Sequence, residues 1–157
     1  MMEEPMGLFD GLKKKGSGIS ENETKARELL EAHETKALND TAFLKAFGKI
    51  EVLYSTPFGD TKDGQHKLFL IPGPAPTGYM PLFLNESEMK EYYERIGRGP
   101  YTILKGPFAE VLEVGLARNK EGKLPVKIGY LIDPLKYKVT VDAPILEAVI
   151  RLLKEGK

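Results

Sequence analysis

The sequence of 157 residues predicts an α+β fold: a mixed, mostly antiparallel sheet of about six strands with packed helices, in a single domain. Three observations support this prediction. Helix-capping signatures and strand-like runs alternate along the whole chain. Several neighbouring strand-like runs are joined by short turns, as in antiparallel hairpins. No glycine-rich turn links a first strand to a helix, which disfavours a doubly wound nucleotide-binding fold.

Two helices are predicted near the start of the chain. Ser20-Glu21-Asn22-Glu23 has the form of a capping box, so the first helix should begin at about Glu21 and fade near Asn39-Asp40. The second helix is short, over 42–47. Gly48 should close it in the left-handed conformation, where a side chain would be strained.

The middle of the chain is predicted to form strands. Residues 50–54 and 67–71 are rich in β-branched and aromatic side chains, and Asp63-Gly64 between them is typical of a turn. Residues 72–78 include three prolines, each lacking a backbone donor, so an ordered loop is expected there. Residues 80–84 resume as a third strand.

After the third strand, helices and strands alternate. Residues 85–88 repeat the capping signature and predict a helix that ends at Gly97. A short strand over 101–104 should follow, and then a helix with Pro107 in its first turn, where the missing donor costs nothing. That helix should end before a polar turn over 119–123.

The last third of the chain is predicted to hold two strands, over 126–132 and 137–141, with a bend at Asp133-Pro134 between them. Asp142 should cap the final helix, because a carboxylate at this position can accept hydrogen bonds from free backbone amides. Pro144 lies near the start of that helix, where proline is well tolerated.

Composition excludes several classes of protein. The 23 basic and 23 acidic side chains balance, which disfavours general attraction to nucleic acid. The absence of cysteine excludes disulfides, thiolate catalysis and Cys-ligated metals. No run approaches the ~18 apolar residues of a membrane span, and no secretory signal pattern is present. We therefore expect no transmembrane segment and a cytoplasmic location.

Residues 1–20 differ from the rest in composition and are predicted to form a mobile arm. Residues 21–157 should form the α+β domain, with a helical extension at its N-terminus. Within the arm, Leu8-Phe9, Leu12 and the three lysines 13–15 permit only weak contact with an anionic membrane surface.

No motif in the sequence indicates catalysis or a cofactor. His33 lies on the polar side of the first predicted helix and His66 beside a predicted turn, and neither has the spacing of a paired metal or catalytic site. The nucleophile-elbow and phosphate-loop patterns are missing. We therefore expect no cofactor and favour a non-enzymatic role, without excluding an enzyme whose site is built from ordinary carboxylates, Tyr and Arg.

One region fits a partner-binding surface. Rigid prolines, glycines and aromatic side chains gather around the 72–78 loop and the 97–101 turn. Strand alternation places Tyr79 and Phe83 together on one face, which is either covered by a helix or exposed to a partner. Two other interpretations remain open: a loop packed by its own side chains, and a small-ligand site near this loop. The candidate partner-binding residues are Pro74, Pro76, Tyr79, Phe83 and Tyr101.

Short motifs spread over residues 37–153 carry a resemblance to a known family. They are Gly78-Tyr79-Met80-Pro81-Leu82-Phe83-Leu84-Asn85, Tyr92, Gly99-Pro100-Tyr101, Pro107, Ile132-Asp133-Pro134 and the segment Phe43 to Tyr54. Together they resemble the amino-terminal domain of the SseB family, named for enhanced serine sensitivity.

The chain departs from the family pattern at three points. Leu84-Asn85 stands in place of Thr-Ser, Asp133 in place of an asparagine, and no second domain follows. The resemblance implies a bacterial α+β domain without established enzymatic activity, from a family discussed alongside secretion and virulence. Together with the missing catalytic motifs, it leads us to expect a non-enzymatic protein-interaction module linked to secretion or stress. The resemblance assigns no catalytic residues to this chain.

Overall fold

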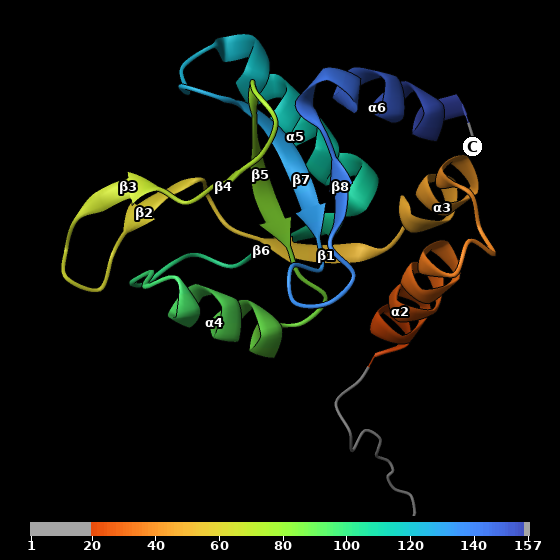
Figure 1. The fold of residues 1–157 in the computed structure, drawn as a ribbon, viewed down its shortest axis with the longest axis horizontal. Coiled ribbons are helices and arrows are strands. Elements are labelled where there is room, and N and C mark those ends of the chain that lie inside the picture. Colours follow the sequence, from red (N-terminus) through yellow and green to blue (C-terminus); the bar gives the residue numbers. More distant parts are fainter. Residues whose placement is uncertain (1–19, 156–157) are drawn as a thin grey trace, which may run out of the picture.

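The computed structural model describes residues 20–155, so the predicted mobile arm lies almost wholly outside the described residues. Within them the chain is mixed helix and strand, as expected (Figure 1). In chain order the helices are α2 (Glu21–Glu34), α3 (Asp40–Phe47), α4 (Glu86–Arg95), α5 (Phe108–Glu121), the 3-10 helix η1 (Ala143–Ile145) and α6 (Leu146–Glu155). The strands are β1 (Glu51–Tyr54), β2 (Phe58–Asp60), β3 (His66–Leu68), β4 (Ile71–Pro72), β5 (Thr77–Leu82), β6 (Leu104–Pro107), β7 (Lys127–Ile132) and β8 (Val139–Val141).

The strands of residues 20–155 form three small sheets and not the predicted single sheet of about six strands. The four-stranded sheet has the order β4-β5-β7-β8, with β5 and β7 parallel and the other neighbours antiparallel. β1 pairs with β6 and β2 with β3, both antiparallel. The β1–β6 pair meets the end of β5 only at the bridge between Leu53 and Phe83, so the two sheets do not merge. Mostly antiparallel pairing is nevertheless confirmed.

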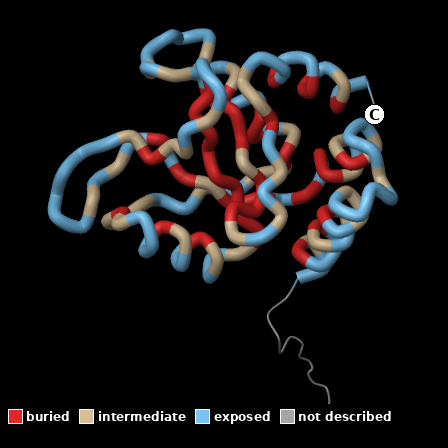
Figure 2. The backbone as a smooth tube through the Cα atoms, in the orientation of Figure 1, coloured by how far each residue is buried: buried red, intermediate tan, exposed pale blue. Residues whose placement is uncertain are grey.

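The core surrounds β5 and β7, which lie at the centre of the molecule (Figures 1 and 2). All six residues of β5 are buried. Met80 and Leu82 face the main core with residues of α3, α5, α6 and β7, while Phe83, just beyond β5, packs with Met89 and Tyr93 of α4. This alternation is the one that the sequence predicts, and α4 covers the Phe83 side.

Helix α2 packs directly on this core. Its Ala26 and Leu30 are fully buried in the main cluster. The Ser20 hydroxyl caps the helix as predicted, accepting from the Glu23 amide at 3.1 Å. The Glu23 carboxylate does not return to the cap: it accepts from Arg27 at 2.8 Å, and Arg27 also binds Glu88 of α4 at 2.8 Å. This chain of charges joins α2 to α4.

Several local predictions are wrong at element ends. Helix α2 ends at Glu34, before the expected Asn39-Asp40. Gly48 has φ of −55° and is right-handed, because the chain runs from α3 straight into β1. Helix α5 continues through the predicted polar turn, and Gly122, with φ of 69°, is the left-handed residue that ends it. The predicted strand over 101–104 is shifted, because β6 at 104–107 pairs with β1 and makes Pro107 the N-cap of α5.

Gly115 of α5 makes a close approach that yields a test of the packing. A Cβ at this position would fall on the hydroxyl of Tyr130, which is fully buried and donates to the Val111 carbonyl at 2.6 Å. Alanine normally stabilises a helix interior by about 1 kcal/mol relative to glycine. Here we expect Gly115→Ala to destabilise the fold by about 1–3 kcal/mol in urea unfolding, because the core is overpacked.

The matched control is the same substitution in a Tyr130→Phe background. Removing the hydroxyl takes away the closest clash and leaves ring carbons at 3.0 Å, so the cost of Gly115→Ala should fall by about 1 kcal/mol. An equal loss of unfolding free energy on Gly115→Ala in the two backgrounds would contradict the close contact between Gly115 and the Tyr130 hydroxyl.

Candidate functional site

A groove of about 540 Å³ lies between the α2–α3 corner and strand β8. This volume falls within the roughly 300–1,000 Å³ of typical ligand pockets. Side chains of α3, β8, η1 and the turn before β8 supply its apolar lining: Phe43, Leu44, Tyr137, Val139, Val141 and Ile145. Phe43 and Val141 are buried, whereas Ile145 is 49% exposed and offers its side chain to the solvent. We call this hollow the β8 groove.

Polar contacts hold the walls of the β8 groove in place. On the helical wall, His33 Nε2 lies 2.8 Å from Asp40 Oδ1, and the His33 ring packs on Phe43 with centroids 4.5 Å apart. Tyr137, in the turn before β8, donates its hydroxyl hydrogen bond to the Glu31 carboxylate of α2 at 2.9 Å. His33, judged solvated from the sequence, therefore serves as a wall residue, bound to a neighbouring helix.

The turn before β8 is built around Asp133. The Asp133 amide donates to the Leu82 carbonyl at 2.9 Å, and its carboxylate accepts from the Tyr137 amide at 3.0 Å. Asp133 and Lys138 have positive φ, 56° and 54°, which reverses the chain within a few residues. Since Asp133 is buried and tied to the end of β5, the turn fixes β8 beside β7.

The outer edge of β8 is free of pairing within the described chain. β8 ends the strand order of its sheet and pairs only with β7, and all three of its residues line the β8 groove. The opposite edge is β4, a two-residue strand whose Pro72 lacks an N–H donor. Unpaired strand edges readily accept another strand, and prolines block this. Of the two edges of this sheet, β8 is therefore the one that can pair with another strand.

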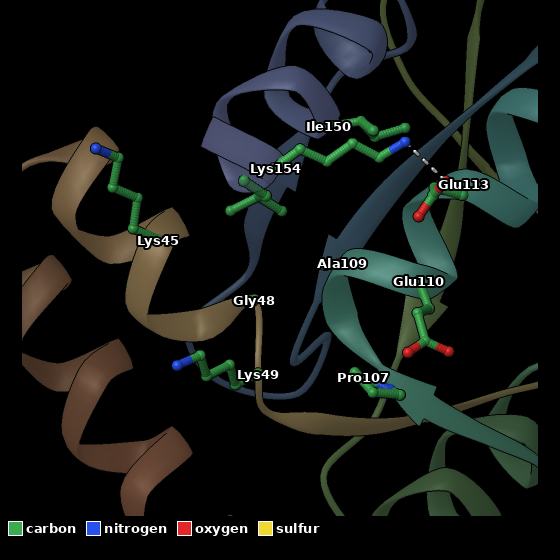
Figure 3. A pocket seen from close by; sticks show the side chains of 10 residues that line it. Lys45, Gly48, Lys49, Pro107, Ala109, Glu110, Glu113, Ile150 and Lys154 are labelled. Carbon is green, nitrogen blue, oxygen red and sulfur yellow. Dashed lines mark ion pairs between the residues drawn. The ribbon is translucent and has the colours of Figure 1, made fainter. Parts of the chain in front are cut away.

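A second hollow, of about 280 Å³, lies between the end of α3, the start of α5 and α6 (Figure 3). Its charged groups do not converge. The Lys45 and Lys49 amines point away from Glu110, and Lys154 Nζ reaches Glu113 Oε1 at 3.4 Å (Figure 3).

The start of α5 beside this hollow is also occupied. The Phe108 and Ala109 amides donate to the carbonyls of Ile50 and Gly48 at 2.8 and 3.0 Å. These two first-turn donors are therefore used by the chain itself.

The structure does not bring the five predicted partner-binding residues onto one surface. Pro74 and Pro76 are exposed and Tyr101 is half-buried. Tyr79 is only 8% exposed and Phe83 only 1%, so these two rings present almost no area to a partner. The face that they share is covered, which is one of the two outcomes that the sequence allowed.

Residues 72–78 form the connection of a tight hairpin. Pro72 pairs with Gly78 across it, the Ala75–Pro76 peptide bond is cis, and the Thr77 amide donates to the Pro74 carbonyl at 2.7 Å. The predicted loop is thus correct for its middle, whereas its two ends belong to β4 and β5.

Tyr79 and Asp142 link this hairpin to the start of η1. The Tyr79 ring lies on Gly73, and its hydroxyl donates to Asp142 Oδ1. This hydrogen bond raises the pKa of the Tyr79 hydroxyl, because only the protonated form can donate it. Asp142 occupies the N-cap position of η1 but makes no side-chain capping bond there. Its predicted capping role is therefore wrong: its carboxylate is bound to Tyr79.

Sequence reasoning missed Arg98, which is 3% exposed and surrounded by aromatic rings. Its Cζ lies 4.7 Å from the ring centroid of Phe69, 4.8 Å from Tyr93 and 5.7 Å from Tyr101. Nη2 donates to the carbonyls of Thr56 and Phe58 at 3.1 and 3.2 Å. The signal available in the sequence was an arginine between two glycines with tyrosines on both sides.

Burial in this aromatic cluster raises the pKa of Tyr93 to about 12, although the nearby Arg98 charge opposes the shift. The phenol therefore stays neutral at physiological pH, and its ring can act as a cation–π partner of the guanidinium. Arg98 fastens the base of the β2–β3 hairpin to the end of α4.

Within residues 20–155 no cluster of three or more His, Asp or Glu side chains is placed to hold a metal ion. The helices in the same range are all too short or too polar to cross a membrane. No protein-family model matches the chain, and no curated protein or solved structure is significantly similar to it. The resemblance to the SseB family therefore stays a prediction.

Proposed function

We propose that this protein is a non-enzymatic protein-interaction module that contacts its partner at the β8 groove. The observation that carries the proposal is the juxtaposition of an unpaired strand edge with an apolar groove. Backbone donors and acceptors along β8 supply affinity, and Ile145, Leu44 and Val139 supply apolar contact. A role in a bacterial cell, linked to secretion or stress, rests on the SseB resemblance alone.

The alternative is a small-ligand binder or enzyme with a site near the 72–78 loop. This hypothesis has less support, since the polar groups of that region bind one another. The Thr77 hydroxyl accepts from the Ala143 amide at 3.0 Å, and the Tyr79 hydroxyl is bound to Asp142.

Affinity capture with paired variants tests the proposal. Ile145 lines the groove and is 49% exposed, so Ile145→Glu should fold normally while placing a charge against the partner's apolar side chains. Val114 on α5 is 41% exposed, and the β8 groove does not include it, which makes Val114→Glu a matched control. With the full chain as bait in lysate of the source cell, partners should be retained by the wild type and the Val114 variant.

The Ile145 variant should lose those partners by about tenfold or more in recovered amount. Recovery that is equal with all three baits would contradict the β8 groove as the contact surface. Retention of a small metabolite with no groove-dependent protein would favour the alternative function.

A further inference from the structure

We propose that Arg98 and Ser55 together hold a small monovalent anion, of the size of chloride, at the base of the β2–β3 hairpin. The two side chains are only 3% and 1% exposed. Three of their polar atoms, Nε and Nη1 of Arg98 and Oγ of Ser55, have no hydrogen-bond partner among the described residues. This site is separate from the β8 groove, so the proposal stands apart from the proposed function.

The charge of Arg98 is the first reason to expect an anion. None of the ion pairs within residues 20–155 includes this guanidinium. The rings of Phe69 and Tyr93, with centroids 4.7 and 4.8 Å from Cζ, and the carbonyls that accept from Nη2 solvate the charge without neutralising it. A buried charge without an opposite charge is unfavourable, and an anion beside the guanidinium removes this imbalance.

The free donors of Arg98 indicate where the anion lies. Nε and Nη2 share one edge of the planar guanidinium. A Cβ on Gly59 would lie 2.7 Å from Nη2 and 2.8 Å from Nε, so this edge faces the backbone of β2. Nη1 is on another edge and carries two N–H donors directed away from Gly59. We therefore place the anion beside Nη1.

Ser55 supplies a second donor on the same side of the chain. Successive side chains of a strand point to opposite sides, so residues two apart share a side. Leu53 of β1 packs in the cluster that contains Tyr93, and Ser55 follows it by two residues. The next residue, Thr56, accepts from Nη2 of Arg98 at 3.1 Å, which brings this part of the chain alongside the guanidinium. The Ser55 hydroxyl can then donate to the same anion as Nη1.

The enclosure of the site determines the size of the anion. Since Arg98 and Ser55 are almost wholly buried, the occupant must be surrounded by the protein, which favours a free ion over the carboxylate of a partner protein. A water molecule can accept from both donors but brings no charge to balance the guanidinium. The edges of the neighbouring aromatic rings carry partial positive charge, which also suits an anion.

The test measures urea unfolding of the full chain while sodium chloride replaces sodium gluconate at constant total salt. Gluconate is too large for an enclosed site and serves as the reference anion. An ion that binds only the folded protein stabilises it in proportion to its occupancy. Between about 1 and about 100 mM chloride, the equilibrium constant for unfolding should fall about tenfold, as for a Kd of about 10 mM.

Ser55→Ala is the most informative variant. It removes a buried hydroxyl that has no partner in the chain, so in gluconate it should be at least as stable as the wild type. Its response to chloride should fall below about twofold. Ser87 on α4 is exposed, and Ser87→Ala should keep the full response. Arg98→Met should abolish the response, and if this variant does not fold, Ser55→Ala decides.

Crystals grown with sodium bromide in place of chloride locate the ion. We expect an anomalous bromine peak within hydrogen-bond distance of Arg98 Nη1 and Ser55 Oγ. A chloride response that is absent, or equal in the wild type and Ser55→Ala, would overturn the proposal. Density at the site without a bromine signal would indicate water, and a bromine peak without chloride-dependent stability would indicate an adventitious ion only. Either result would also overturn it.

Discussion

Replacement of Arg98 by alanine is expected to destabilise the protein by about 3 kcal/mol or more. Nη2 of Arg98 donates to the carbonyls of Thr56 and Phe58, and hydrogen bonds from charged groups contribute about 1.5–3 kcal/mol each. Truncation also removes three cation–π contacts and leaves a cavity among Phe69, Tyr93 and Tyr101. Chemical denaturation, followed by circular dichroism, measures the loss.

Arg95 supplies a matched control on the same part of the chain. Its side chain is 64% exposed and pairs with Glu91 one helical turn away. Exposed pairs of this kind contribute about 0.3–0.5 kcal/mol, so Arg95→Ala should be nearly neutral. Similar losses in Arg95→Ala and Arg98→Ala would contradict a special role for the buried guanidinium.

The Arg98→Lys variant distinguishes the stability contributed by the positive charge from that contributed by the guanidinium geometry. Lysine keeps the positive charge but lacks the planar fork that reaches two carbonyls while stacking on rings. We expect it to recover only part of the stability lost in Arg98→Ala. The remaining defect should be local: hydrogen exchange should speed up at Gly99 and Lys62, whose amides donate to Asp60 and Gly97 and tie the β2–β3 hairpin to this turn.

Replacement of Tyr79 by alanine should destabilise the protein by about 3 kcal/mol, because it removes a buried aromatic ring that packs on Gly73. Urea unfolding measures the change. An exposed ring would cost less than about 0.5 kcal/mol. If Tyr79→Ala leaves stability nearly unchanged and abolishes partner capture, Tyr79 contacts the partner and the burial of this face is contradicted.

Tyr79→Phe is the matched control for the ring. It keeps the packing on Gly73 and removes only the hydroxyl that donates to Asp142. A single hydrogen bond contributes about 1 kcal/mol, so the phenylalanine variant should lose about that much. If both variants lose the same stability, the hydrogen bond and not the ring holds the hairpin.

Interactions between residues close in sequence were sufficient to predict the helix ends described next. Ser20 and Asn85 cap α2 and α4 through their own side chains, as the capping signatures predict. The positive φ of Gly97 at the end of α4 follows from the same kind of reasoning. These features depend on contacts within a few residues, and a sequence displays such contacts directly.

The larger sheet organisation depended on distant contacts. β6 is shifted to Leu104–Pro107 because it pairs with β1. Tyr101 instead packs its ring on that of Tyr93, with the ring centroids 4.7 Å apart. The strand propensity of 101–104 carries no information about either partner. For the same reason the sequence did not predict β2, joined parts of β3 and β4 into one strand over 67–71, and did not indicate the division into three sheets.

The candidate site was decided almost entirely by tertiary structure. Sequence reasoning gathered Tyr79, Phe83 and Tyr101 with the proline loop, since rigid and aromatic residues cluster there, and did not consider β8 as a surface. Tyr137, which lines the β8 groove, is hydrogen-bonded to Glu31 of α2, 106 residues away. Composition and periodicity describe one segment at a time. Only the packing of distant segments determines which strand edge stays unpaired and which apolar side chains stand beside it.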